Sequence, residues 1–171
     1  MLTAVIDYKV LNSLNIVEDY SHIEDYDDTM SVEAHICEIL SEQKLITVGT
    51  FLDGNGFANQ TFDIYVDYIY VSSDIKNLLL FLASENDAKK MSIEWYLVST
   101  ILVFTKIEDN QIKIERFHDR TKEICFSIVM HKRELLFRTE VFVEAIKSLI
   151  RLLFPIGYQR MAEFNYSIYD D

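Results

Sequence analysis

The sequence predicts an α+β fold with a mainly antiparallel, meander-like sheet, a short middle helix and a longer C-terminal helix packed on one face. Apolar segments rich in β-branched residues follow one another from residue 92 to residue 138, with connections too short for a crossover helix. Residues 139–154 then carry apolar side chains at helical spacing. One proline and four glycines in 171 residues leave little room for a linker, so we expect a single domain spanning 1–171.

The N-terminal part is expected to contain two strands, with a segment of ambiguous pattern between them. LTAVIDYKVL (2–11) alternates in the manner of a strand, and LITVGTFL (45–52) is the second strand. SVEAHICEILSEQ (31–43) has apolar residues at helical spacing after Ser31, which can act as an N-cap. The same residues also fit a strand that turns back through SEQK, and we slightly favour the strand.

The clearest predicted strand is TFDIYVDYIYVSS (61–73), which is rich in aromatic and β-branched residues and follows the turn signal DGNG (53–56). Ser73 or Asp74 is then expected to cap a short helix, IKNLLLFLAS (75–84).

The rest of the chain is expected to form the meander and the final helix. The predicted strands are SIEWYLVSTILVFTKI (92–107), IKIERF (112–117), KEICFSIVM (122–130) and ELLFR (134–138). Thr139 is the expected N-cap of the last helix, TEVFVEAIKSLIRLLF (139–154), and Pro155 stops it. Its predicted buried stripe consists of Phe142, Ile146, Leu149 and Leu153.

Negative charge is concentrated near the N-terminus. The net charge is −12, and residues 1–43 hold ten acids and one base, whereas residues 89–171 hold twelve acids and thirteen bases. The acidic segment, residues 17–29, contains EDYSHIEDYDD with six carboxylates. Because phosphate would be repelled, nucleic acid and anionic membrane are excluded as partners of this half, and a basic protein is the natural complement.

Several patterns favour a soluble cytoplasmic protein. The first residues, MLTAVIDYKV, do not resemble a secretory signal, and the apolar runs at 78–83 and 96–104 are much shorter than the roughly 20 residues needed to span a bilayer. Cys37 and Cys125 are the only cysteines, and we expect both to be reduced and buried.

No catalytic, cofactor or metal motif is recognisable, so we expect a protein that is not an enzyme and has no cofactor. The histidines (22, 35, 118 and 131) do not form HExxH, and no GxSxG or phosphate-binding glycine loop occurs. Asp63 and Asp67 share a strand face, but about 13 Å would separate them, beyond the roughly 5–10 Å of glycosidase carboxylate pairs. A metal-dependent enzyme that uses the acidic segment is a less favoured alternative.

The acidic segment is the candidate partner-binding site. Charge runs are commonly solvated loops, but dense like charge costs repulsion, and tyrosine is enriched where proteins bind each other. Clustered negative potential accelerates the encounter with a cationic partner, and buried tyrosines would lengthen the lifetime of the complex. The predicted contact residues are Glu18, Asp19, Tyr20, Glu24, Asp25, Tyr26, Asp27 and Asp28.

In size, in EDYSHIEDYDD, in the aromatic segment FDIYVDYIYV and in the closing ELLFRTEVFVEAIKSLIRLL, the chain resembles the immunity proteins of bacterial polymorphic and contact-dependent toxin systems. The resemblance covers the whole chain in outline, without a diagnostic motif. It implies a non-catalytic inhibitor that binds one cognate toxin domain, with a nuclease as the expected type because its active site is basic.

Two alternatives use other surfaces. A DNA mimic or phage-type inhibitor of a nucleic-acid-binding protein would need rows of acids at phosphate-like spacing, which a single concentrated segment does not favour. An interaction module would pair the aromatic segment 61–72 with a partner strand. The sequence is compatible with a monomer or a homodimer.

Overall fold

Two antiparallel sheets are present in the computed structural model, which describes residues 2–21, 29–50, 60–62, 64, 71–84, 89–95, 100–108 and 110–163. The smaller sheet has the order β1-β2-β3, from β1 (Leu2–Ile6), β2 (Ile46–Thr50) and β3 (Gln60–Phe62). The larger sheet has the order β4-β5-β6-β7, from β4 (Lys90–Trp95), β5 (Thr100–Ile107), β6 (Gln111–His118) and β7 (Ile124–His131). This antiparallel meander, together with its helices, confirms the predicted α+β class.

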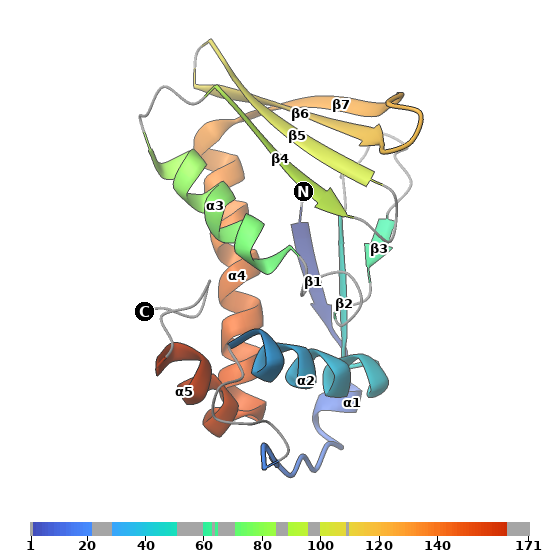
Figure 1. The fold of residues 1–171 in the computed structure, drawn as a ribbon, viewed down its shortest axis with the longest axis vertical. Coiled ribbons are helices and arrows are strands. Elements are labelled where there is room, and N and C mark those ends of the chain that lie inside the picture. The colour runs from blue at the N-terminus through green and yellow to red at the C-terminus, as the bar shows by residue number, and fades with distance from the viewer. Residues whose placement is uncertain are drawn as a thin grey trace.

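The helices lie between the two sheets and at the end of the molecule that is opposite the larger sheet. They are α1 (Tyr8–Leu11), α2 (Thr29–Glu42), α3 (Ser72–Ala83), α4 (Lys132–Leu153) and α5 (Pro155–Glu163). α4 starts at the larger sheet, passes α3 and the smaller sheet, and ends beside α2 and α5 (Figure 1). The long C-terminal helix therefore packs on β6 and β7 and also continues well beyond them.

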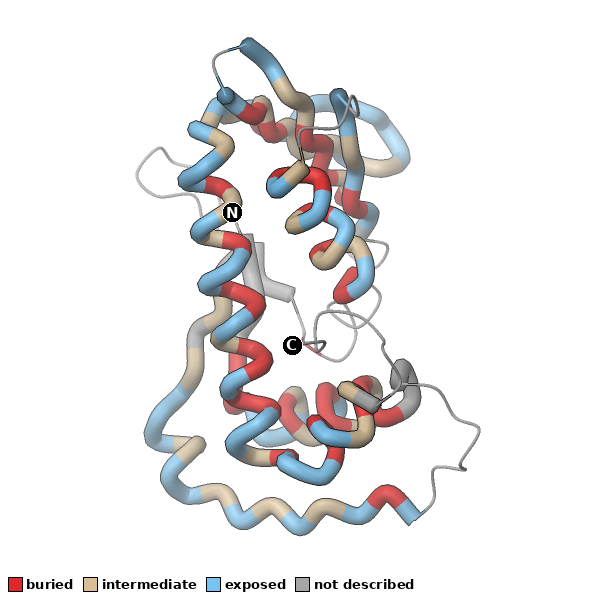
Figure 2. Tube along the Cα trace, turned by 90° about the vertical axis from the view of Figure 1, so that its left-hand side faces the viewer, coloured by how far each residue is buried: buried red, intermediate tan, exposed pale blue. Residues whose placement is uncertain are grey.

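One hydrophobic cluster joins these parts. Its buried side chains come from both sheets and from α2, α3, α4 and α5, and the buried residues of α4 follow the side that faces the interior (Figure 2). In the larger sheet, Ile93 lies opposite Leu102 and Phe104 lies opposite Ile114, all four buried. The alternation expected of a strand with one covered face thus positions this sheet over α3 and α4.

The strand favoured for residues 31–43 is wrong, because residues 31–42 lie in the helix α2. Val32, Ile36 and Leu40 are all fully buried, and their four-residue spacing places them on one helical face. Burial of this face against α5 and the core selects the helix over the strand.

The predicted start of the last helix is also wrong. ELLFR lies inside α4 and not in a strand, and His131 is the N-cap, with its Nδ1 accepting from the backbone N of Arg133 at 3.3 Å. Thr139, the expected cap, is buried mid-helix and its hydroxyl donates to the carbonyl of Leu135 at 2.8 Å. The predicted stripe is buried at Phe142, Ile146 and Leu149, and half-buried at Leu153.

Other predicted element boundaries differ from the observed ones. Pro155 does end α4, but it also starts α5, which the sequence pattern did not predict. The α3 cap position is Val71, one residue before Ser72, so neither Ser73 nor Asp74 is the cap. Of the predicted strand 61–73, residues 61 and 62 lie in the short strand β3, whereas 72 and 73 are wrong as strand because they begin α3; 63 and 65–70 lie outside the described residues. The predicted turn 53–56 and residues 96–99 of the predicted strand 92–107 also lie outside the described residues; the rest of that strand belongs to β4 and β5.

Segment 2–11 is divided between β1 and α1 because Asp7 interrupts the strand. Its Oδ1 accepts from the backbone N of Lys9 at 2.9 Å and of Val10 at 3.3 Å, which starts a helical turn.

Replacing Asp7 with alanine should therefore lower the free energy of unfolding by about 1 kcal/mol, the usual cost of losing an N-cap. Asp7→Asn keeps the acceptor and should cost less. Urea unfolding of the two variants tests this, and equal losses would contradict a capping role.

The two cysteines differ in burial. Cys37 is buried as expected, but the prediction is wrong for Cys125, which is exposed on β7; neither cysteine forms a disulfide among the described residues. No described helix is long and apolar enough to cross a membrane.

Candidate functional site

The acidic segment enters the folded structure through Glu18. Its Oε1 accepts from the backbone N of Ile156 at 3.2 Å, and its Oε2 accepts from the backbone N of Gly157 at 2.9 Å. These N–H groups belong to the first turn of α5, where helical N–H groups have no partner within the helix. Glu18 thus closes the N-terminus of α5, and its negative charge lies at the positive end of the helix dipole.

Tyr20 supports the same contact between Glu18 and α5 from the buried side. Its ring is 9% exposed, and its hydroxyl donates to Oε2 of Glu18 at 2.9 Å. The ring also meets His35 of α2 edge to face, with 5.8 Å between ring centroids. Burial, followed by the bond to Glu18, raises the pKa of Tyr20, so its hydroxyl keeps the proton that it donates.

Close packing at Gly157 leaves no room for a side chain. A Cβ atom at this position would overlap the hydroxyl oxygen of Tyr20 and would come within 2.8 Å of Cδ1 of Ile36. The absence of a side chain at Gly157 therefore allows α5, Tyr20 and α2 to pack together.

The structure separates the eight predicted contact residues into three groups. Glu18 and Tyr20 are occupied by internal contacts that hold α5, so their side chains serve the fold. Asp19 is exposed, and its Oδ1 accepts from the backbone N of Ser21 at 2.9 Å. The other five lie outside the described residues: Glu24, Asp25, Tyr26, Asp27 and Asp28.

Both ends of the acidic segment are attached to packed elements. Glu18 and Tyr20 hold one end on α5, and at the other end Thr29 begins α2. α2 itself packs against α5. The described residues of the segment, 17–21 and Thr29, therefore lie at the end of the molecule built from α1, α2 and α5, away from the larger sheet (Figure 1).

This end also carries positive charge. The guanidinium of Arg160 on α5 acts on Tyr20, where it opposes the rise in pKa. Arg151, at the end of α4, donates to the hydroxyl of Tyr158 at 2.7 Å and lies over its ring. Positive side chains therefore lie beside the described acids at this end of the molecule.

One buried carboxylate was not predicted from the sequence. Glu33 of α2 is only 3% exposed, and one of its oxygens accepts from the hydroxyl of Ser72 at 3.2 Å. Ser72 is the first residue of α3, so the bond ties α2 to α3. A single glutamate among apolar residues of a helix gives no sequence signal for such a role.

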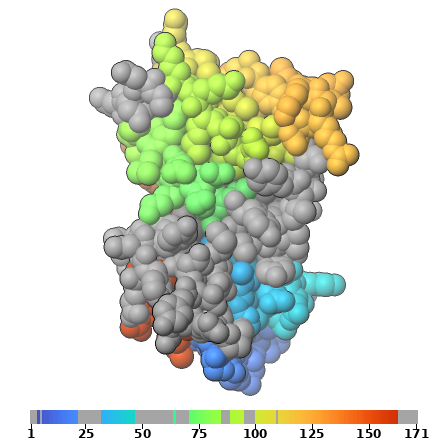
Figure 3. Space-filling model, viewed as in Figure 1, coloured from blue at the N-terminus to red at the C-terminus, as the bar shows by residue number. Residues whose placement is uncertain are grey.

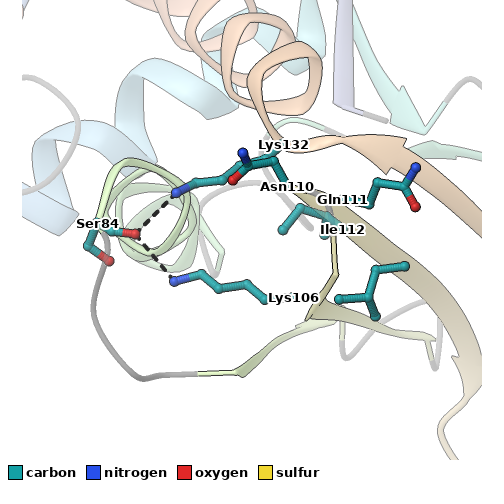
Figure 4. A pocket seen from close by; sticks show the side chains of 7 residues that line it. Ser84, Lys106, Asn110, Gln111, Ile112 and Lys132 are labelled. Atoms are coloured by element: carbon teal, nitrogen blue, oxygen red, sulfur yellow. Dashed lines mark hydrogen bonds between the residues drawn. The ribbon is translucent and has the colours of Figure 1, made fainter.

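A second polar site lies at the C-terminal end of α3. A cavity of about 280 Å³ opens between the end of α3, the β5–β6 turn and the start of α4. The ammonium groups of Lys106 and Lys132 both donate to the carbonyl oxygen of Ser84, at 3.4 and 3.2 Å (Figure 4). Lys106 also lies 4.5 Å from the centre of the Phe81 ring.

The two lysines have a clear structural role. Burial, and then the nearby charge of Lys132, lowers the pKa of Lys106. Two cations at the carbonyl end of α3 complement its dipole and fasten this helix to β5 and α4. The lysines lie 22 and 48 positions from Ser84, so the sequence alone gave no sign of the arrangement.

Among the residues that the structure describes, no group of three or more His, Cys, Asp or Glu side chains could hold a metal ion. His35 lies 4.0 Å from a carboxylate oxygen of Glu38, one turn along α2.

No protein-family model, no curated protein and no solved structure matches the chain. Any functional assignment therefore depends on the residues and geometry described above.

Proposed function

We propose that this chain is a non-catalytic acidic binding protein that neutralises a basic partner, and specifically an immunity protein that inhibits a cognate nuclease-type toxin domain. The observation that carries the proposal is the attachment of the acidic segment at both ends, by Glu18 and Tyr20 on α5 and by Thr29 on α2. An acidic run that only served solubility would not need such an attachment.

Attachment matters because binding costs conformational entropy. A segment whose ends are already held loses less freedom when it meets a partner than a free tail does. The residues that we assign to the partner contact are the remaining predicted ones: Asp19, Glu24, Asp25, Tyr26, Asp27 and Asp28.

The charge distribution supports the same function. Space-filling atoms of the N-terminal segment and α2 lie at one end of the long axis, and those of β4 to β7 lie at the other (Figure 3). Residues 1–43 are strongly acidic, whereas residues 89–171 are nearly balanced. Such a one-sided field orients a basic partner toward the acidic end during encounter.

The test replaces Glu24, Asp25, Asp27 and Asp28 with their amides and measures association with the purified product of the adjacent gene. We expect the association rate at low salt to fall at least about tenfold and its salt dependence to flatten, because steering depends on these charges. The melting temperature should be unchanged.

The matched control neutralises the same number of exposed acids away from the acidic segment, namely Glu94, Glu108, Glu134 and Glu140. This control has the same net charge and should associate almost as fast as the unmodified chain. Equal rates for the two variants would remove the role of the acidic segment. A neighbouring gene product that neither binds the chain nor is inhibited by it would remove the toxin assignment.

A further inference from the structure

Two lysines from distant parts of the chain converge at the C-terminal end of α3. Lys106 lies in β5 and Lys132 is the first residue of α4, yet both ammonium groups donate to the carbonyl oxygen of Ser84, at 3.4 and 3.2 Å (Figure 4). The two nitrogens are therefore no more than two hydrogen-bond lengths apart. Burial and then the charge of Lys132 lower the pKa of Lys106, which reflects how close the two cations are.

The same two side chains line the open cavity of about 280 Å³ at this end of α3. The described residues that line it include two cations and no acid. Asn110 and Gln111 add side-chain amides to the lining, and an amide can donate hydrogen bonds to an oxyanion (Figure 4). The cavity is several times larger than the roughly 30 Å³ that a water molecule occupies in the liquid, so it has room for a phosphate group.

Backbone hydrogen bonds hold the walls of this cavity in place. The backbone N of Lys132 donates to the carbonyl of Asn110 at 2.7 Å, which fixes the start of α4 on the β5–β6 turn. The backbone N of Lys106 donates to the carbonyl of Lys89 at 2.8 Å, which fixes the end of β5 beside the start of β4. Because both cations are positioned in advance, little conformational freedom is lost when a ligand binds beside them.

Capping of α3 alone does not require two lysines. One cation at the carbonyl end of a helix already complements its dipole, and a second cation beside it adds repulsion. A dianion complements a pair of ammonium groups better than a carboxylate does, because it offers each of them a negative charge. An ammonium group has three donors, so a lysine that holds the Ser84 carbonyl can bind a phosphate oxygen as well.

We propose that the cavity beside Lys106 and Lys132 binds a small dianionic oxyanion of the phosphate or phosphomonoester type. The two lysines donate charge-assisted hydrogen bonds to its oxygens, as lysine does in many phosphate sites. Asn110 and Gln111 contribute amide donors from the β5–β6 turn. This cavity lies by the larger sheet, away from α2 and α5 (Figure 1), so the inference does not depend on the proposed function.

Thermal unfolding of the full chain with inorganic phosphate, at an ionic strength held constant with sodium chloride, tests this inference. Phosphate should raise the melting temperature by about 3 °C at roughly ten times its dissociation constant. Lys106→Met and Lys132→Met keep an unbranched side chain and should each raise that dissociation constant at least about tenfold. Acetate should have a much smaller effect, and an acetate response as large as that of phosphate would overturn the assignment to a dianion.

The matched control is Lys90→Met, which removes an exposed cation of β4 that does not line the cavity. It should bind phosphate like the unmodified chain. An unmodified chain whose melting temperature does not respond to phosphate would overturn the inference. Equal responses of the three lysine variants would do the same, because the attraction would then come from the total charge and not from this cavity.

Nuclear magnetic resonance of the unmodified chain provides a second measurement should the variants at Lys106 and Lys132 not fold. Phosphate should shift the backbone amide signals of Ser84, Asn110 and Gln111 first, and shifts confined to other parts of the chain would contradict the site. Phenyl phosphate distinguishes the source of the anion. Tighter binding than that of inorganic phosphate would identify a phosphomonoester of a larger molecule, and equal or weaker binding would identify the free ion.

Discussion

Replacing Glu18 with alanine is expected to lower the free energy of unfolding by about 3 kcal/mol, because a helix cap and a buried hydrogen bond are lost together. Glu18 accepts from two backbone N–H groups of α5 and from the hydroxyl of Tyr20. A lost helix cap alone costs about 0.5–2 kcal/mol, and a buried hydroxyl left without its acceptor costs about 1–3 kcal/mol. Chemical denaturation with urea measures the sum.

Glu18→Gln and Glu42→Ala are the controls for this prediction. The glutamine keeps one acceptor oxygen and should give an intermediate loss. Glu42 is an exposed acid on α2, and its substitution by alanine should change the stability by no more than about 0.5 kcal/mol. If Glu18→Ala were as mild as Glu42→Ala, the carboxylate would not be holding α5.

The same variant separates structure from partner binding within the acidic segment. Glu18 is occupied by α5, so its loss should reduce stability and, in the folded protein, alter the association rate only as much as the loss of one charge does. The acids of 24–28 should behave in the opposite way, with normal stability and slower association. If only the total charge of the acidic segment mattered, the loss of any one of its acids would have the same effect on binding.

The larger sheet was predictable because its pattern is local. Residues 112–117 and 122–130 are apolar segments rich in β-branched residues, and the short connections between them leave antiparallel pairing as the simplest arrangement. Such a signal needs no knowledge of distant residues. The structure confirms the antiparallel meander that it predicted.

The helices were harder to predict because short apolar segments fit either a helix or a strand. Residues 31–43 have both helical spacing and β-branched content, and the choice is made by burial against α5, more than a hundred residues later in the chain. ELLFR was separated from its helix because Thr139 resembles an N-cap. In the folded chain the hydroxyl of Thr139 bonds the carbonyl four residues earlier, which a mid-helix threonine also does.

The roles of Glu18 and Tyr20 could not be predicted for a related reason. The sequence predicts an acidic, tyrosine-containing run, but it does not reveal that Glu18 meets residues 138 and 139 positions away. Tyrosine at a protein interface and tyrosine in a core have the same local sequence signature. The distinction depends on tertiary packing, here on a helix that begins at Pro155 and was itself not predicted.

Gly157→Ala is expected to destabilise the protein by about 2 kcal/mol, against the usual trend for this substitution. Within a helix, alanine is normally favoured over glycine by about 1 kcal/mol. At Gly157, however, the new methyl group would overlap the Tyr20 hydroxyl and press on Ile36. Tyr20 cannot easily move aside, because its ring is buried and its hydroxyl is bonded to Glu18. Forcing a methyl group into such a site costs about 1–3 kcal/mol, which outweighs the gain in helix propensity.

A double-mutant cycle with Tyr20→Phe tests the cause. Phenylalanine removes the oxygen that the new methyl group would overlap, so Gly157→Ala should cost clearly less in the Tyr20→Phe background than in the unmodified chain. Thermal or urea unfolding of the four proteins supplies the coupling free energy. A stabilised Gly157→Ala variant, or equal losses in both backgrounds, would mean that α5 does not rest on Tyr20. The attachment of the acidic segment to this end of the molecule would then lose its physical basis.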